Sequence, residues 1–316
     1  MQAVIQVYSL PVFAIVLPLI MRKKITRFII RFIVTCFVLL IVALFIFDRL
    51  VQFRMDDAEL TQYFAQKHQQ VNIGYYATHN RTIRYARAGA DTTATLFFIH
   101  GAPSSLSYFK DYMTDSTLLQ HATMYAVDRP GYGYSGLAKP IPFIDQQAAM
   151  IKPVIDSLHK VHHPVILVAA SFGTAIACRL AMDNPGLVDG IVLMAPAIAP
   201  GEERVFWFSP AIETPLLNWT VPRMLQSANT EKLHHKEELT KMLPLWQKIR
   251  VPVIYLQGDK DELVYTTNAG FARKQLVNAP FVEINMIPGR GHLIAFSERK
   301  LVTEKIMKMI EMTEKK

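Results

Sequence analysis

The sequence predicts an α/β protein, in which helices cover both faces of a mostly parallel β-sheet, preceded by an N-terminal transmembrane segment. Two observations lead to this prediction: short apolar stretches alternate with helical ones from residue 95 onward, and residues 32–47 contain no charge. Strand–helix alternation produces parallel sheets with helices on both faces. Hydrophobic residues make up 51% of the 316 residues and charged residues only 19%, which excludes a disordered chain.

Residues 1–47 are expected to form a membrane anchor. The run Phe32–Phe47 is free of charge, and extending it back to Phe28 gives twenty residues that only Arg31 interrupts. That length spans a bilayer core of about 30 Å. Residues 1–21 are a second charge-free stretch, weakened by prolines, so we expect a single span, or two if this stretch also crosses. A cleaved signal peptide is the alternative, but no small-residue cleavage site follows the run.

The charge distribution predicts the topology. Residues 1–47 hold no acid and five basic residues: Arg22, Lys23, Lys24, Arg27 and Arg31. These should stay in the cytoplasm, which places everything after Phe47 on the exocytoplasmic side, periplasmic or extracellular. The rest of the chain has 29 basic and 26 acidic residues, so the net charge of +8 does not predict nucleic-acid binding. Two cysteines, Cys36 and Cys178, exclude a disulfide framework.

The elements after the anchor can be assigned in order. Residues 48–70 are polar with apolar residues at helical spacing, which predicts a linker helix. The main domain, residues 71–316, should open with a hairpin of residues 71–76 and 82–86. The expected strands that follow are 95–99, 123–127, 165–169, 191–194, 251–256 and 281–286, and the expected helices include 142–159, 172–183 and 297–313. Between the fourth and fifth of these strands, residues 197–246 interrupt the alternation and predict a helical cap insertion.

One strand–turn–helix segment predicts a nucleophile. An apolar strand runs into Ser171 and then into a helix of small residues. A serine on such a sharp turn needs small residues two positions before and two after it. Ala169 and Gly173 occupy these positions; Ala169 departs from the usual glycine but is still small. The alternative without catalysis is that Ser171 only caps the helix at Phe172.

An acid and a base follow at the ends of later strands. A serine nucleophile needs a base to take its proton and an acid to orient that base. Asp261 lies just after the strand 251–256, and His292 lies after the strand 281–286. Because the carboxyl ends of parallel strands meet at one edge of the sheet, these side chains should gather near Ser171. Asp259, in the same turn as Asp261, is the runner-up for the acid.

With these residues in place, the chain resembles the α/β-hydrolase superfamily, in its capped serine-hydrolase group with a Ser-Asp-His triad. The resemblance covers residues 71–309 and depends on four motifs: His100-Gly101-Ala102-Pro103, the run from Asp128 to Gly136, the Ser171 turn, and the turns of Asp261 and His292. It implies the α/β-hydrolase fold and no cofactor. It also implies that the backbone N–H groups of Ala102 and Phe172 form the oxyanion hole.

The resemblance implies a membrane-anchored serine hydrolase that cleaves a carboxylic ester through an acyl-serine intermediate on a small-molecule substrate. Trp207, Phe208 and Trp219 of the cap either line the acyl pocket or pack the cap against the core. The alternatives are an enzyme like prolyl aminopeptidases, a C–C-bond hydrolase, or a catalytically silent binding protein of the same fold. The sequence Ala102-Pro103-Ser104 lacks the glycine-rich run of the peptidases.

Two further patterns have ordinary explanations. The run from Gly131 to Gly136 fits a dinucleotide-binding glycine pattern, but Pro140 and Pro142 keep it in a loop instead of opening a helix. The histidines at 159, 162, 163, 234 and 235 have no carboxylate or thiol to complete a metal site, so we expect solvated side chains and no bound metal.

Overall fold

The computed structural model describes residues 13–79, 81–90, 93–159 and 164–314. Contacts divide the chain into two compact units, one ending at Arg49 and one beginning at Leu50. In the first unit, helix α1 (Phe13–Leu50) contains the segment Lys24–Leu50, whose mean hydropathy of 3.0 and lack of buried side chains suit a membrane span. Among the described residues it is the one helix that is long and apolar enough to cross a membrane. Most of the second candidate stretch, residues 1–12, lies outside the described part.

The second unit contains an eight-stranded sheet in the order β1-β2-β4-β3-β5-β6-β7-β8. The hairpin β1 (Val71–Thr78) and β2 (Arg81–Ala88) pairs antiparallel and joins β4 antiparallel. All other pairs are parallel. The remaining strands are β3 (Ala94–Ile99), β4 (Ala122–Val127), β5 (Val165–Ala170), β6 (Gly190–Met194), β7 (Val253–Gly258) and β8 (Val282–Ile287). This sheet confirms the predicted fold class.

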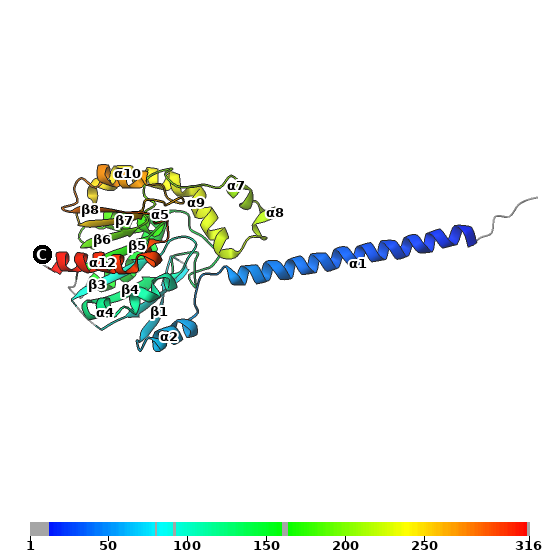
Figure 1. Cartoon of the computed structure of the whole chain (residues 1–316), viewed down its shortest axis with the longest axis horizontal. Coiled ribbons are helices and arrows are strands. Elements are labelled where there is room, and N and C mark those ends of the chain that lie inside the picture. Colours follow the sequence, from blue (N-terminus) through cyan, green and yellow to red (C-terminus); the bar gives the residue numbers. More distant parts are fainter. Residues whose placement is uncertain (1–12, 80, 91–92, 160–163, 315–316) are drawn as a thin grey trace, which may run out of the picture. The chain divides into compact units, whose positions relative to one another are not determined.

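Alternation along each central strand builds two cores, one on each face of the sheet. In β5, Val165 and Leu167 belong to one apolar cluster, whereas Ile166 and Val168 belong to the other. Side chains of consecutive strand residues point to opposite faces, so a strand buried on both faces is apolar throughout. The first face is covered by α5 (Ile144–His159), α6 (Gly173–Asp183) and α10 (Thr267–Gln275). The second is covered by α2 (Asp57–Gln66), α3 (Lys110–Met113), α4 (Ser116–His121), α11 (Ile294–Ser297) and α12 (Arg299–Glu314) (Figure 1).

The segment expected to be a linker helix packs onto the sheet. Helix α2 begins with a capping box, in which the Asp56 side chain accepts from the Glu59 N–H and the Glu59 side chain accepts from the Asp56 N–H. Its Leu60 and Phe64 are fully buried in the core of the second face. Residues 57–66 are therefore part of the second unit's packed structure.

The predicted cap lies between β6 and β7. It consists of α7 (Ser209–Ile212), α8 (Pro215–Asn218), the long helix α9 (Arg223–Met242) and a 3-10 helix, η2 (Leu243–Lys248). A second 3-10 helix, η1 (Leu106–Phe109), follows β3. Figure 1 shows α7 and α8 projecting from the second unit at the side where α9 begins. Because the cap follows β6 and precedes β7, it stands over the carboxyl edge of the parallel strands.

Candidate active site

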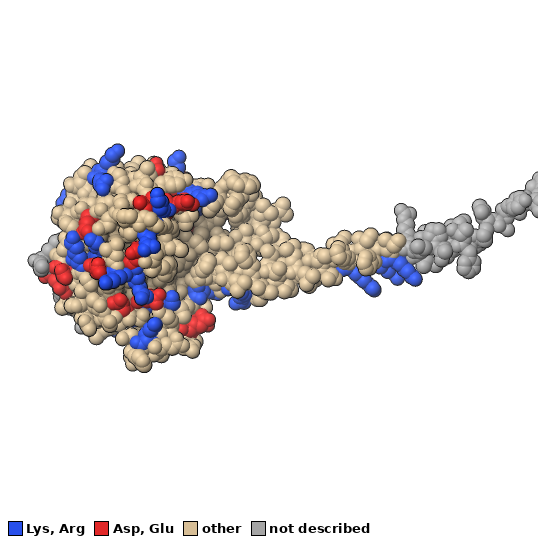
Figure 2. All heavy atoms as spheres, viewed as in Figure 1, with Lys and Arg blue, Asp and Glu red and all other residues tan. Residues whose placement is uncertain are grey.

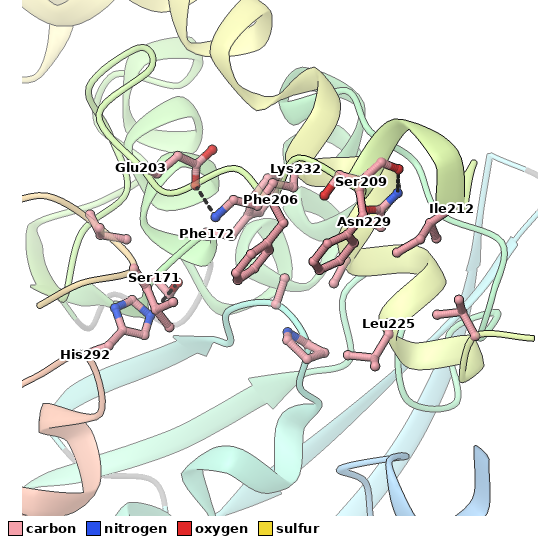
Figure 3. A pocket seen from close by; sticks show the side chains of 17 residues that line it. Ser171, Phe172, Glu203, Phe206, Ser209, Ile212, Leu225, Asn229, Lys232 and His292 are labelled. Atoms are coloured by element: carbon pink, nitrogen blue, oxygen red, sulfur yellow. Dashed lines mark hydrogen bonds and ion pairs between the residues drawn. The ribbon is translucent and has the colours of Figure 1, made fainter. Parts of the chain in front are cut away.

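The structure brings the three predicted catalytic side chains together. Ser171 follows β5, Asp261 follows β7 and His292 follows β8, so all three lie at the carboxyl edge of the sheet. The Ser171 Oγ is 3.0 Å from His292 Nε2 (Figure 3). His292 Nδ1 is 2.9 Å from Asp261 Oδ2. Because a carboxylate can only accept, His292 carries its proton on Nδ1 and its Nε2 is free to accept the serine proton.

The turn at Ser171 has the geometry expected of a nucleophile. Its φ of 50° lies in the left-handed region, which is strained for a residue with a side chain. The Ser171 N–H donates to Met194 O at 2.9 Å, which fixes the turn to β6. At Gly173, a Cβ would lie 2.5 Å from the carbonyl oxygens of Ile99 and His100, so only glycine fits there. Ala169 is fully buried within β5, where the sheet accommodates its methyl group.

Asp261, and not Asp259, is the acid that reaches the histidine. The Asp261 Oδ1 accepts the N–H groups of Leu263 and Val264 at 3.0 and 2.9 Å, which leaves Oδ2 for His292. Asp259 instead accepts the Gly289 N–H at 2.7 Å on the exposed side of the turn. Burial tends to raise the pKa of Asp261, but its hydrogen bonds to His292 and to the two amides hold that pKa below its ordinary value. The carboxylate therefore stays ionised at neutral pH.

Two side chains hydrogen-bond to the carbonyl of the peptide group between Gly101 and Ala102. The Gly101 carbonyl accepts from His100 Nδ1 at 2.7 Å and from Arg129 Nη2 at 3.1 Å. The His100 Nε2 accepts the Arg129 N–H at 3.0 Å, so this histidine is neutral, and burial lowers its pKa well below the usual value. In a trans peptide the C=O and the following N–H point in opposite directions. Holding the Gly101 oxygen therefore fixes the direction of the Ala102 N–H, a predicted oxyanion donor.

Arg129 is itself held by an acid from the cap. Its guanidinium donates to both carboxylate oxygens of Glu231 on α9, at 2.7 and 3.0 Å, and both side chains are fully buried. The same carboxylate accepts from Tyr132 Oη and Gln147 Nε2, each at 2.6 Å. Burial alone would lower the pKa of Arg129, but Glu231 and Tyr132 raise it above its ordinary value. The network joins the cap to the loop that carries Ala102.

A ring contact connects the cap to the other predicted oxyanion residue, Phe172. His235 of α9 lies over the Phe172 ring, with 4.5 Å between centroids, and its Nδ1 is 2.6 Å from Glu203 Oε1. Burial tends to raise the pKa of Glu203, but His235 and Lys232 hold it below its ordinary value. The expectation of a solvated His235 is wrong: this histidine is fully buried, because the polar face of α9 turns inward. The histidines at 162 and 163 lie outside the described residues.

A cavity of about 340 Å³ adjoins Ser171 and His292. Ala102 and Phe172 line it beside the catalytic pair. The rest of the lining is mostly apolar and comes from the loop after β3, the cap and the turn after β7: Pro103, Glu203, Phe206, Phe208, Ser209, Ile212, Val221, Leu225, Ala228, Asn229, Lys232, Leu263 and Val264 (Figure 3). Apolar walls with a few polar groups are typical of sites for small organic ligands.

Of the three aromatic residues expected at the pocket, one lines it. Phe208 belongs to the cavity wall, whereas Trp207 and Trp219 lie outside the lining. Trp207 neither lines the pocket nor packs the cap onto the core, because it is 91% exposed and contacts Phe208 edge-on. Phe206 and Phe208 stack with 5.3 Å between their ring centroids and line the cavity, whereas Trp207 between them is exposed. Sequence reasoning missed Arg129, Glu203, Glu231 and His235.

The residues described by the structure contain no group of three or more His, Cys, Asp or Glu side chains that could hold a metal ion. Cys178 is buried in α6 and Cys36 lies on α1, both as free thiols.

The chain belongs to the alpha/beta hydrolase family, which matches it over residues 96–304. Solved structures with similar folds include a candidate lipase from Acinetobacter baumannii AYE, with a TM-score of 0.65 and 17% identity over 83% of this chain and 98% of that one. A membrane phospholipase A, described as a bacterial virulence factor, has a TM-score of 0.61 and 16% identity over 90% of this chain and 98% of its own. A carboxylesterase from Bacillus subtilis has a TM-score of 0.57 and 16% identity over 80% and 97% of the two chains. At these identities the likeness concerns the fold.

Proposed function

We propose that this chain is a membrane-anchored serine hydrolase that cleaves a carboxylic ester through an acyl-serine intermediate. The observation that carries the proposal is the hydrogen-bonded series Ser171–His292–Asp261 beside an apolar cavity. The lipase and carboxylesterase among the similar folds support an ester as the substrate.

The chemistry follows from the positions of the three groups. The Ser171 Oγ attacks the ester carbonyl while His292 Nε2 takes its proton, and Asp261 stabilises the resulting imidazolium. His292 then gives that proton to the leaving alkoxide, which departs as an alcohol and leaves acyl-Ser171. Water, deprotonated by His292, attacks the acyl carbonyl and releases the acid, which restores the serine.

The developing oxyanion needs donors beside Ser171. The N–H groups of Ala102 and Phe172 are our candidates, since both residues line the cavity next to the serine. Loss of one such donor costs roughly 3–4 kcal/mol of transition-state stabilisation in measured systems. Holding the Gly101–Ala102 peptide in one orientation before substrate arrives supports this role.

The peptidase and silent-protein alternatives fit the site less well. An aminopeptidase needs a carboxylate to hold the substrate amine, and Glu203 is the one carboxylate among the described lining residues. Glu203 is already paired with His235 and Lys232. A catalytically silent protein would have no reason to keep Ser171 in a strained backbone conformation beside a base.

A substrate panel tests the ester assignment. Purified full chain should hydrolyse p-nitrophenyl esters and leave matched p-nitroanilides of the same acyl groups intact, and Ser171→Ala should hydrolyse neither. Faster cleavage of the amides would move the proposal to the peptidase alternative. Absence of cleavage, together with no labelling of Ser171 by a fluorophosphonate, would favour the silent binding protein.

We also propose that the segment Lys24–Leu50 is an uncleaved anchor and that the second unit lies on the exocytoplasmic side. Its length and hydropathy, with basic residues before the apolar run, support this topology. Carbonate-washed membranes should retain the chain, and protease added to spheroplasts should degrade the second unit. A mature N-terminus near Asp48 would identify a signal peptide, and full protease protection would place the unit in the cytoplasm.

A further inference from the structure

We infer that an apolar surface on the cap inserts into the bilayer in which the chain is anchored, so that the substrate is a lipid ester taken from that bilayer. The inference deepens the proposed function. The surface, called the cap surface below, comprises Val205, Trp207, Leu216, Leu217 and Trp219, all of them exposed. Trp207 is 91% exposed, Leu216 78% and Trp219 50%.

The cap surface is nearly free of charge. The segment 205–222 has a single ionisable side chain that is charged at neutral pH, Glu213. That carboxylate is occupied within the cap, since it accepts from Asn229 Nδ2 at 3.0 Å and from Thr230 Oγ1 at 2.7 Å. Figure 2 shows the charged side chains gathered over the rest of the second unit, while the region of α7 and α8 carries almost none. Contiguous exposed apolar surface of this kind marks an interaction site.

Tryptophan and leucine at an exposed tip suit a lipid surface. Indole rings favour the boundary between headgroups and acyl chains, because they combine a large apolar body with one polar N–H. Leucines beside them add apolar area that a bilayer covers and water does not. A lipid surface also accepts a convex tip without a shape-matched partner.

The second unit begins at the edge of the sheet that carries the cap. The candidate span ends at Leu50, and Gln52 is already buried, so about two residues, or roughly 7 Å of extended chain, separate them. The first residues of the second unit then contact the sheet's carboxyl edge, where Arg54 Nη1 donates to Gly133 O at 2.7 Å. Helix α9 of the cap rests on the same loop, since Ser227 Oγ donates to Gly131 O at 2.8 Å. The chain thus begins the second unit at the edge that carries the cap.

The cap surface continues into the cavity. Phe206 and Phe208 flank Trp207 in sequence and line the cavity that adjoins Ser171. Both rings are also partly exposed, at 36% and 40%. An acyl chain leaving the bilayer therefore finds a continuous apolar path from the cap surface to the nucleophile, without crossing water.

Bromine quenching of tryptophan tests the docking independently of catalysis. The chain has three tryptophans; two are on the cap surface and the third, Trp246, is fully buried in the core. Full chain reconstituted in phosphatidylcholine vesicles should lose emission when the acyl chains are brominated. The variant Trp207→Phe/Trp219→Phe, which retains only Trp246, should lose none. Ser171→Ala should be quenched like the wild type.

A turnover measurement tests the lipid route. Trp207→Ser/Leu216→Ser should lower hydrolysis of a bilayer-resident lipid ester by about tenfold or more, because less apolar area enters the membrane. Hydrolysis of a soluble short-chain ester should stay unchanged. Val277→Ser removes an apolar side chain that is 63% exposed and lies outside the cap, between α10 and β8, and should alter neither rate.

The outcomes separate this inference from the proposed function. Wild-type emission that bromine does not quench would overturn the cap surface as a bilayer contact, whatever the enzyme hydrolyses. A detergent-stable dimer that Trp207→Ser dissociates, without quenching, would make a second copy of the chain the occupant and would equally overturn it. Quenching with no turnover of any ester would leave the docking in place and overturn the hydrolase.

Discussion

Replacing the cap's buried acid should expose how strongly the cap is tied to the core. The two carboxylate oxygens of Glu231 together accept four hydrogen bonds. In Glu231→Gln, an NH₂ group replaces one of these oxygens, and this group can only donate, so it cannot pair with the donors around it. Arg129 then keeps its charge in a fully buried site without a counter-ion. Removing one partner of a buried pair costs about 3–5 kcal/mol. For a domain of this size, that loss lowers Tm by roughly 6–20 °C.

Thermal unfolding of the detergent-solubilised full chain, followed by circular dichroism, measures this loss. Glu237→Gln is the matched control, because it makes the same chemical change on the same helix at a side chain that is 70% exposed. We expect its Tm to match that of the wild type. If Glu231→Gln lowered Tm no more than Glu237→Gln does, the buried network would not be what holds the cap.

The same variant tests whether the network positions the oxyanion loop. Arg129 holds the Gly101 carbonyl and so orients the Ala102 N–H. At temperatures below its Tm, Glu231→Gln should therefore lower kcat on a soluble ester and leave KM nearly unchanged. The decrease in kcat should be at most the roughly 10²–10³-fold that loss of a whole oxyanion donor costs. A purely structural role would change Tm and leave kcat of the folded variant untouched.

Three other predictions concern single side chains. Ser171→Ala should keep the wild-type Tm and lose ester turnover and fluorophosphonate labelling, which activity assays and mass spectrometry would check; retained turnover would end the serine-hydrolase account. Asp261→Asn should lose far more kcat than Asp259→Asn, since only Asp261 contacts His292; the reverse ranking would show that the acid is misassigned. His235 and Lys232 hold the pKa of Glu203 below its ordinary value. The ionised Glu203 therefore stabilises the folded state at pH values above the unfolded-state pKa, and this stabilisation is lost as the pH falls through the lower folded-state pKa. The Tm difference between wild type and Glu203→Gln should thus be present at pH 7 and vanish in strong acid; a constant difference would contradict the ion pairing.

The sequence predicted the sheet because its central strands are short, apolar and separated by helices. The apolar run 165–169 predicted a strand, and the structure places the side chains of Val165–Ala170 in both cores. The positions of Ser171, Asp261 and His292 followed from the same pattern, since each residue lies in the turn that follows a strand. Because the carboxyl ends of parallel strands meet at one edge of the sheet, the strand pattern alone placed these three residues together, although they are distant in sequence.

The buried side of the cap could not be predicted in this way. Helix α9 has polar residues at helical spacing, including Ser227, Glu231 and His235, and its mixed composition gives no sign of which face turns inward. Burial of Glu231 depends on Arg129, which lies about a hundred positions away, and no local pattern encodes that pairing. The polar residues that recur along one face of α9 were a signal in the sequence. Because the sequence does not show that Arg129 pairs with this face, the pattern predicted a solvent-exposed face. Trp207 was misjudged for a related reason, because aromatic composition does not say which residues of a cap segment face the cavity.

The most direct test of the account is to look for the acyl-enzyme itself. The full chain is mixed with a p-nitrophenyl ester, quenched in acid within the first turnovers, digested and examined by mass spectrometry. The account predicts that the peptide containing Ser171 gains the mass of the acyl group and that Asp261→Asn accumulates far less of it in the same time. Release of p-nitrophenol with an unmodified Ser171 peptide, or with the acyl group on another residue, would contradict it.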